Sequence, residues 1–299
     1  MKDSMLELKK IMALEAEKVE AALESYGQEP DEDLQILFDA EGYSLLGGGK
    51  RIRPFLVNEV CRMLGGDERA SMPFACALEM IHTYSLIHDD LPCMDDDDLR
   101  RGKPTNHKKF GYANALLAGD ALLTKALFVA SSNPHTDRAT AAEAVLLLSE
   151  AAGECGMIGG QIMDLAGEHK KLSLEKLHRL HSMKTGALIR VAVQLGCLAA
   201  GCSKESAEMA ATVAYAEKIG LAFQVIDDIL DVTGSEAELG KSVGGDADHE
   251  KTTFLSYYDV DGAKEYAASL TAEAVSAIST LKYSEVLTDL AVYLLERTY

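Results

Sequence analysis

The spacing of apolar and polar residues predicts a chain built almost entirely of α-helices. Charged and apolar positions alternate at helical spacing over residues 1–23, which predicts an amphipathic helix at the N-terminus. All six prolines lie between Pro30 and Pro134, so residues 135–299 contain no proline to interrupt a helix. Runs of alternating β-branched and aromatic residues are missing, which argues against a sheet. We therefore predict an all-α fold, with one domain over residues 1–299.

Turn-forming residues divide this pattern into separate helices. Glycine-rich or polar segments predict breaks at 27–33, 45–54, 64–71, 99–111, 131–137, 166–173 and 233–253. The segment 233–253 is the longest, and a long polar loop in a compact domain is more often a lid or binding loop than a plain connection.

Charge and cysteine usage narrow the classes of function. The chain has 48 acidic residues against 29 lysines and arginines, a formal charge of −19, so it repels nucleic acids and other polyanions. A phosphorylated ligand would need metal ions or a local basic cluster. The six cysteines show no metal-binding spacing, which favours reduced thiols in the cytoplasm. Arg190 and Gln194 interrupt a long apolar stretch, and the N-terminus lacks a signal-peptide core, so we expect no membrane span.

The first candidate site is the run from Asp89 to Asp98, which holds six carboxylates in ten residues. An acidic run by itself is more often a solvated loop. This one follows the apolar segment MIHTYSLIH, and a helix that is apolar all round is normally buried, where carboxylates need cations. Pro92 clashes with the carbonyl of His88, so the helix loosens and Asp95 can turn back toward Asp89 and Asp90.

The second candidate site lies within FQVIDDILD at 223–231. On a helix, Gln224, Asp227, Asp228 and Asp231 stand at i, i+3, i+4 and i+7, one polar stripe on an apolar rod. The stripe offers only oxygen donors of the kind that Mg²⁺ prefers. One such helix is as readily a plain amphipathic face, but two in one all-α chain favour a metal site.

Basic residues form a third group, in loops or at helix ends. Glycines let backbone amides approach an anion, and lysine or arginine adds charge-assisted hydrogen bonds to phosphate oxygens. The Walker pattern is absent, so GGGK is a weak signal alone. His82 lies on the helix face of Asp89, although a lone histidine is more often part of a core. The basic segments are 47–54, 100–103, 184–185 and 240–251.

These groups together indicate a reaction in which a substrate loses its diphosphate group and becomes a carbocation. Two carboxylate helices would hold Mg²⁺ on a diphosphate, and the basic loops would hold that group and a second phosphorylated substrate. Metal and lysine charge would stabilise the departing diphosphate while a dry helical cavity protects a carbocation from water. We find no Ser/His/Asp or Cys/His nucleophile, and an ionising leaving group needs none.

At these motifs the sequence resembles the trans-type short-chain prenyl diphosphate synthases, and most closely the bacterial farnesyl diphosphate synthases. The resemblance runs from about residue 40 to the C-terminus and implies a homodimer with a central cavity between the two aspartate-rich motifs. It also implies about three Mg²⁺ ions per site, with Mn²⁺ as a substitute. The segments that carry it are GGGKRIRP at 47–54, residues 77–111, LAGDALL at 117–123, GGQIMD at 159–164, KTG at 184–186, FQVIDDILD at 223–231 and GKSVGGDADHEK at 240–251.

The same motif match implies roles for individual residues. Isopentenyl diphosphate would be bound by Lys50, Arg53, His82 and Arg101. The allylic diphosphate would be bound by Arg100, Lys184, Thr185, Gln224, Lys241 and Lys251. Mg²⁺ would be ligated by Asp89, Asp95 and Asp227, with support, or contact through water, from Asp90, Asp228 and Asp231. The developing cation would be faced by Thr185, Gln224 and the carbonyl of Lys184.

The implied reaction joins isopentenyl diphosphate to dimethylallyl diphosphate and then to geranyl diphosphate, giving (2E,6E)-farnesyl diphosphate. The aspartate motif with four intervening residues, and Tyr84 five positions before Asp89, resemble bacterial farnesyl synthases. Tyr84 would end the cavity about 7.5 Å along the helix from Asp89. The helical wheel fits less well, because Tyr84 sits about 140° from Asp89 whereas the small Ser85 lies nearer that face.

Other functions explain fewer of these residues. The nearest alternative is a geranylgeranyl diphosphate synthase. A terpene cyclase would have no second substrate and so no use for Lys50, Arg53 and His82. A non-catalytic partner subunit would not need both aspartate motifs intact, and a Ca²⁺-binding protein would carry EF-hand loops, which this sequence lacks.

Overall fold

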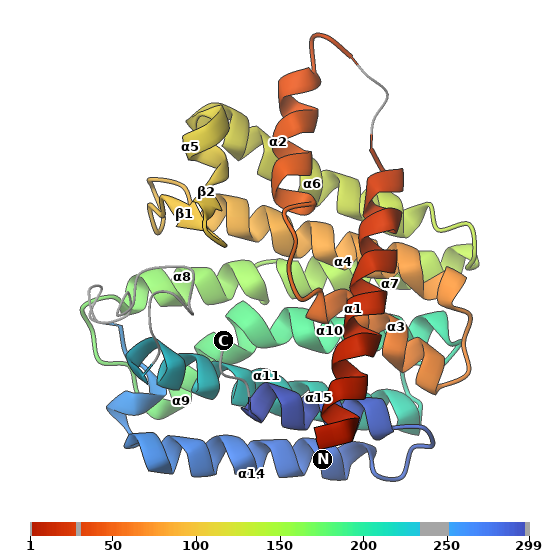
Figure 1. The fold of residues 1–299 in the computed structure, drawn as a ribbon, viewed down its shortest axis with the longest axis vertical. Coiled ribbons are helices and arrows are strands. Elements are labelled where there is room, and N and C mark those ends of the chain that lie inside the picture. The colour runs from red at the N-terminus through yellow and green to blue at the C-terminus, as the bar shows by residue number, and fades with distance from the viewer. Residues whose placement is uncertain (1, 28–30, 234–250, 297–299) are drawn as a thin grey trace.

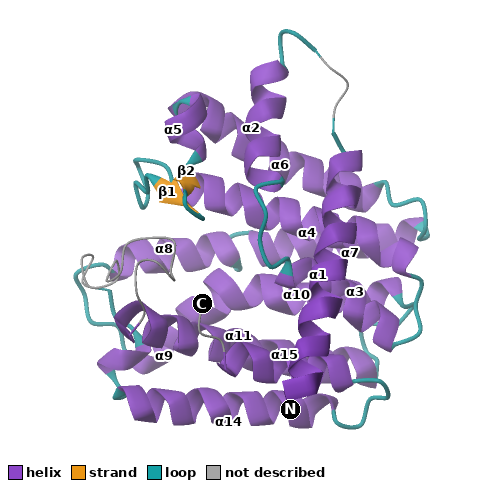
Figure 2. Ribbon diagram, viewed as in Figure 1, coloured by secondary structure: helices purple, strands orange, loops and turns teal. Residues whose placement is uncertain are grey.

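The computed structural model describes residues 2–27, 31–233 and 251–296, and almost all of these residues are helical (Figure 1, Figure 2). The all-α prediction is confirmed. The first seven helices are α1 (Lys2–Ser25), α2 (Gln35–Leu45), α3 (Ile52–Met63), α4 (Glu68–Asp89), α5 (Asn106–Phe110), α6 (Tyr112–Ser131) and α7 (Arg138–Ala152). The remaining ones are α8 (Met157–Gly167), α9 (Leu174–His181), the π-helix η1 (Ser182–Gly186), α10 (Ala187–Ala199), α11 (Ala207–Thr233), the 3₁₀-helix η2 (Phe254–Ser256), α14 (Val260–Ile278) and α15 (Glu285–Glu296).

The long helices pack in the order α6, α4, α10, α11 and α14, and each contacts the next (Figure 1). The amphipathic N-terminal helix that the sequence predicts is α1, which crosses this stack and packs on α3, α4 and α15. The main core runs through α1, α3, α4, α6, α10 and the first half of α11. A second apolar cluster joins α9, the end of α11, η2 and α14 around Phe254. The extent of the domain over residues 1–299 stays a prediction.

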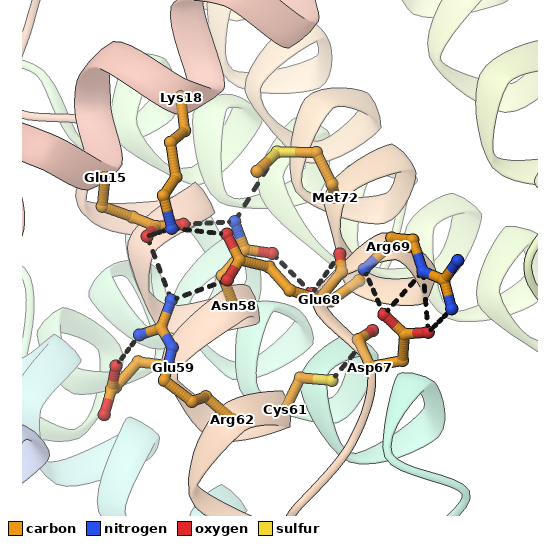
Figure 3. Close-up of polar contacts among 11 residues, drawn as sticks. Glu15, Lys18, Asn58, Glu59, Cys61, Arg62, Asp67, Glu68, Arg69 and Met72 are labelled. Atoms are coloured by element: carbon orange, nitrogen blue, oxygen red, sulfur yellow. Dashed lines mark hydrogen bonds and ion pairs between the residues drawn. The ribbon is translucent and has the colours of Figure 1, made fainter.

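A polar network also holds α1 on the bundle (Figure 3). The carboxylate of Glu15, only 3% exposed, accepts hydrogen bonds from Asn58 at 2.7 Å and Arg62 at 3.0 Å. Ser71 donates to the amide oxygen of Asn58 at 2.7 Å, so the network also reaches α4. A buried carboxylate without such donors would cost several kcal/mol, so these bonds fix where α1 lies.

Segment 99–111, which the sequence predicts to be a loop, contains regular structure. Leu99–Arg100 (β1) pairs antiparallel with Lys103–Pro104 (β2), and α5 follows directly. Arg101 and Gly102 both have positive φ, at 54° and 72°, the backbone of a tight two-residue hairpin turn. Strands of two residues are too short to show an alternating pattern, which explains why the sequence does not reveal them.

Two of the described helices, α6 and α11, are long and apolar enough to cross a membrane by length and composition. Both pack against other helices of the bundle, and half of the relevant window of α11 is buried inside the protein. The apolar character of α11 is therefore explained by its place in the core. That of α6 is not fully explained, because part of its apolar surface is exposed.

Candidate active site

The first aspartate-rich segment turns back on itself at the end of α4. The helix ends at Asp89, and the amide of Asp95 donates to the carbonyl of Asp89 at 2.9 Å. Asp95 is close enough to Asp89 to raise its pKa. The turn predicted at Pro92 is confirmed, and it gathers Asp89, Asp90 and Asp95 at one end of a buried helix.

A cavity of about 530 Å³ begins beside this turn and extends between α4, α6, α8 and η1. The predicted site residues that line it are Arg53, His82, Tyr84, Asp89, Lys184 and Thr185. Ser85 and His88 line it as well, so the cavity takes in more of the circumference of α4 than one helical face. The helical-wheel objection to Tyr84 therefore does not hold, because Tyr84 and Ser85 both border the cavity.

Burial dominates the electrostatics of Asp89. Removal from water raises the pKa of its carboxyl group from 3.8 to about 6, with Lys184 acting in the opposite direction. Asp95 and Asp90 raise it further by repulsion. The site thus holds a carboxylate at an energetic cost that a bound cation would relieve.

Arg53 and His82 form a pair that also lines the cavity. The guanidinium NH1 of Arg53 lies 3.3 Å from Nε2 of His82, and because arginine only donates, that nitrogen accepts. Burial, followed by the charge of Arg53, holds the pKa of His82 well below 6.5, so the ring is neutral at pH 7. Burial likewise lowers the pKa of Arg53, while Glu79 and Asp227 oppose this drop. Asp227, from the second aspartate motif, therefore lies near the same cavity wall.

Arg100 and Asp90 are partners of one another. The Nε of Arg100 lies 2.8 and 2.9 Å from the two carboxylate oxygens of Asp90, which is only 2% exposed. The family resemblance implies that Asp90 supports a metal ion and that Arg100 binds a diphosphate. In this structure the carboxylate of Asp90 and the guanidinium of Arg100 form an ion pair with each other. The neighbouring Arg101 instead donates to the carbonyl of Gly48, in the glycine-rich loop that also carries the exposed Lys50.

Lys184 and Thr185 lie in the π-helix η1, a distortion that sequence patterning does not reveal. Single π-helical turns leave backbone carbonyls without their usual α-helical partners and occur often at functional sites. Helix α8 approaches η1 so closely at Gly160 that a Cβ there would lie 2.2 Å from the backbone nitrogen of Lys184. Only glycine fits between these two segments.

Asp164 is a site residue that the sequence reasoning missed. Its Oδ2 accepts from Lys184 at 2.6 Å and from Lys251 at 3.2 Å, so it joins the two predicted diphosphate-binding lysines. Burial raises the pKa of Asp164, but the two lysines outweigh it and the net shift is downward. In the sequence, Asp164 stands out only as the last residue of GGQIMD, a segment that carries the family resemblance. The resemblance gave no role to this aspartate.

The second motif forms the predicted stripe on α11. The amide of Gln224 donates to Asp227 at 3.1 Å, and Asp231 is half-buried one turn further along. Asp228, by contrast, is buried and accepts the backbone N–H of Phe254 at 2.6 Å. It borders a small hollow of about 40 Å³ together with Asp164 and Lys251. Lys241 lies outside the described residues.

The donor set fits magnesium ions shared with a substrate. Among the described residues, no three His, Cys, Asp or Glu side chains converge on one preformed metal position. Mg²⁺ is commonly held by one or two carboxylates together with waters and substrate phosphates, so a full protein cage is not required. Asp89 lines the cavity, Asp95 lies near Asp89, and Asp227 lies near the cavity residue Arg53, so carboxylates of this kind are available.

Comparisons with known proteins identify the family. A family model described as polyprenyl synthetase matches residues 35–285. The chain belongs to this family. Its relatives include farnesyl diphosphate synthase of Bacillus subtilis, 48% identical over 74% of this chain and 75% of the relative. Geranylgeranyl pyrophosphate synthase 11 of Arabidopsis thaliana is 44% identical over 93% of this chain and 78% of the relative.

A solved member of the family has the same fold and was determined with ligands. The geranyltransferase of Helicobacter pylori, complexed with magnesium and isoprenyl diphosphate, superposes with a TM-score of 0.84. It shares 35% identity, and the match covers 96% of this chain and 95% of that one. The resemblance inferred from the motifs is thereby confirmed.

The raised pKa of Asp89 predicts a pH-dependent stability in the metal-free protein. Folding favours the protonated carboxyl, so this stabilising effect is complete below about pH 4 and is lost as the pH rises through about 6. Asp89→Asn, which stays neutral, should be more stable than the wild type above pH 6, and the difference should vanish near pH 4. Urea unfolding in EDTA across this range measures it.

The control is Asp96→Asn, an exposed carboxylate in the same turn, which should unfold like the wild type at every pH. A difference between wild type and Asp89→Asn that does not change with pH would contradict the prediction.

Proposed function

We propose that this chain is a prenyltransferase that makes (2E,6E)-farnesyl diphosphate by two successive condensations with isopentenyl diphosphate. The observation that carries the proposal is the cavity where Asp89, Arg53 and Lys184 meet over an apolar lining. Charged groups at one end and apolar side chains along its walls match a diphosphate with a hydrocarbon tail. The farnesyl synthases among the relatives support the same product.

Asp89, Asp95 and Asp227 would hold magnesium, about three ions per site as the family resemblance implies, with Asp90, Asp228 and Asp231 in support or in contact through water. Manganese is the proposed substitute. Bound magnesium would neutralise charge on the departing diphosphate. Asp90 and Asp228 already have protein partners, Arg100 and the amide of Phe254, so their support would include holding those elements in place.

In the first condensation the allylic diphosphate is bound by Lys184, Lys251, Arg100 and Lys241, and the bond from C1 to oxygen breaks heterolytically. Charge from the lysines stabilises the diphosphate that leaves. The hydroxyl of Thr185, the amide oxygen of Gln224 and the carbonyl of Lys184 face the allylic cation. The π-helical backbone at Lys184 supports this role, because π-helical turns occur often at functional sites.

Isopentenyl diphosphate is held by Lys50, Arg53, His82 and Arg101. Its double bond supplies the electron pair of the new carbon–carbon bond to C1 of the allylic cation. The released diphosphate then accepts the proton that leaves, restoring a double bond. Geranyl diphosphate repeats the cycle, and the ten-carbon tail extends toward Tyr84, the proposed end of the cavity. Tyr84 lines the cavity and is 5% exposed.

A product assay tests the proposal. Purified protein with labelled isopentenyl diphosphate and dimethylallyl or geranyl diphosphate should yield C15 diphosphate with Mg²⁺ and none in EDTA. Asp89→Asn should lower kcat by about 100-fold or more, because it removes a charge that positions the leaving group, while Asp96→Asn should leave it unchanged. Absence of any condensation product with Mg²⁺ would overturn the proposed function. A C20 main product would favour geranylgeranyl synthesis.

Tyr84 sets the predicted chain length. Tyr84→Ala should shift the product from C15 to C20 and longer chains, because it removes a ring that lines the cavity and that we propose as its end. Tyr84→Phe keeps the ring and should still make C15. Chromatography of the dephosphorylated products measures the distribution, and an unchanged C15 product from Tyr84→Ala would rule out Tyr84 as the stop.

We also propose a homodimer formed through α6. Its exposed apolar side chains, Leu117 and Phe128, are 55% and 68% exposed and border an open groove with α2. A second copy of the chain would cover this apolar surface. The alternative explanation for an exposed apolar surface on α6 is a membrane span. Phe128→Glu should turn a wild-type dimer into a monomer in sedimentation velocity at micromolar concentration. A monomeric wild type would contradict the proposal.

The proposed location is the cytoplasm, without a membrane span. The six cysteines are free thiols in the structure, in keeping with a reducing compartment. The proposed partners are the prenyl diphosphate substrates and a second copy of the chain, with no nucleic acid because of the strongly acidic charge.

A further inference from the structure

Packing alone holds the Tyr84 ring. Its hydroxyl is buried and has no hydrogen-bond partner among the described residues. The ring makes an edge contact with His88, one helical turn later, with ring centroids 5.7 Å apart and an interplanar angle of 78°. The position of the proposed chain-length stop therefore depends on what holds His88.

His88 is held by the neighbouring helix α6, which lies alongside α4 (Figure 1). Its Nε2 lies 3.0 Å from the carbonyl oxygen of Leu116, so this nitrogen carries the hydrogen and donates. The carboxylate of Asp120 lies 4.0 Å from the same nitrogen. One ring thus bridges α4 and α6 while its edge contact supports Tyr84.

The bridge is possible because residue 119 is glycine. A Cβ at Gly119 would lie 2.1 Å from Nε2, 2.4 Å from Cδ2 and 2.9 Å from Cε1 of His88, and these are its three nearest neighbours. Glycine inside a helix costs about 0.5–1 kcal/mol relative to alanine, so its presence in α6 calls for a local packing reason. The His88 ring supplies that reason, because it lies directly over Gly119.

We propose that His88, seated on Gly119 of α6, is a positioning residue that sets product chain length by holding the Tyr84 ring across the end of the cavity. The proposal rests on the proposed function and extends it to a residue and a helix contact that the motifs did not single out. His88 lies in the cavity wall between Tyr84 and Asp89, so its displacement changes the space available to the growing tail.

Product distributions of three single variants test the proposal. His88→Ala should raise the C20-to-C15 ratio by about 2- to 10-fold, the change expected when one aromatic contact is lost. Gly119→Ala should shift the ratio in the same direction, because its methyl group occupies the position of the ring. His88→Gln keeps a donor for the Leu116 carbonyl and should restore part of the wild-type distribution.

Double variants separate positioning from a general loss of structure. In a Tyr84→Ala background, His88→Ala should add no further shift, since the ring that it holds is already gone. In a His88→Ala background, Gly119→Ala should also add nothing, because its methyl group meets only vacated space. The matched control is Gly42→Ala in α2, where a Cβ meets no atom within 4 Å, and its product ratio should equal that of the wild type.

Different results would contradict this inference and the proposed function. A wild type that makes C15, together with His88→Ala and Gly119→Ala variants that keep its product ratio, would overturn the role of His88 and leave the function standing. Additive shifts in the double variants would overturn it as well. A wild type that condenses no substrate would overturn the proposed function itself.

Discussion

The structure depends on placing carboxylates at the end of an apolar helix without leaving them uncompensated. Burial of an isolated carboxylate costs several kcal/mol, and α4 carries Asp89 and Asp90 into the interior. Asp90 meets this constraint with the guanidinium of Arg100. Burial raises the pKa of both carboxyl groups, and in the proposed reaction bound Mg²⁺ would offset this cost at Asp89.

The same principle applies to the half-buried positive charges that line the cavity. Lys184 is held by Asp164, and Arg53 lies against a neutral His82. Lys184, Lys251 and Arg53 thus each have a protein partner before substrate arrives. Such preorganisation in a site shielded from water is the main source of electrostatic catalysis in enzymes.

The sequence predicted the elements that follow from periodicity and from dense motifs. Helical spacing identified α1, and the oxygen-donor stripe on α11 followed from positions 224, 227, 228 and 231. The breaks at 153–156 and 200–206 were missed, because both are short and contain no proline. The π-helix at Lys184 and the pairing of Asp90 with Arg100 depend on tertiary contacts, which a one-dimensional pattern does not contain. Tyr84 shows the same limit, since a helical wheel describes one helix and residues of several elements line the cavity.

The carboxylate of Asp164 has a consequence for turnover. It joins lysines that stand 67 positions apart, one in η1 and one just after residues 234–250. In the proposed reaction, an incoming anion competes with Asp164 for both ammonium groups, which weakens its net affinity. When inorganic diphosphate dissociates, the lysines regain their internal counterion, so Asp164 favours clearance of the by-product as well as the resting geometry.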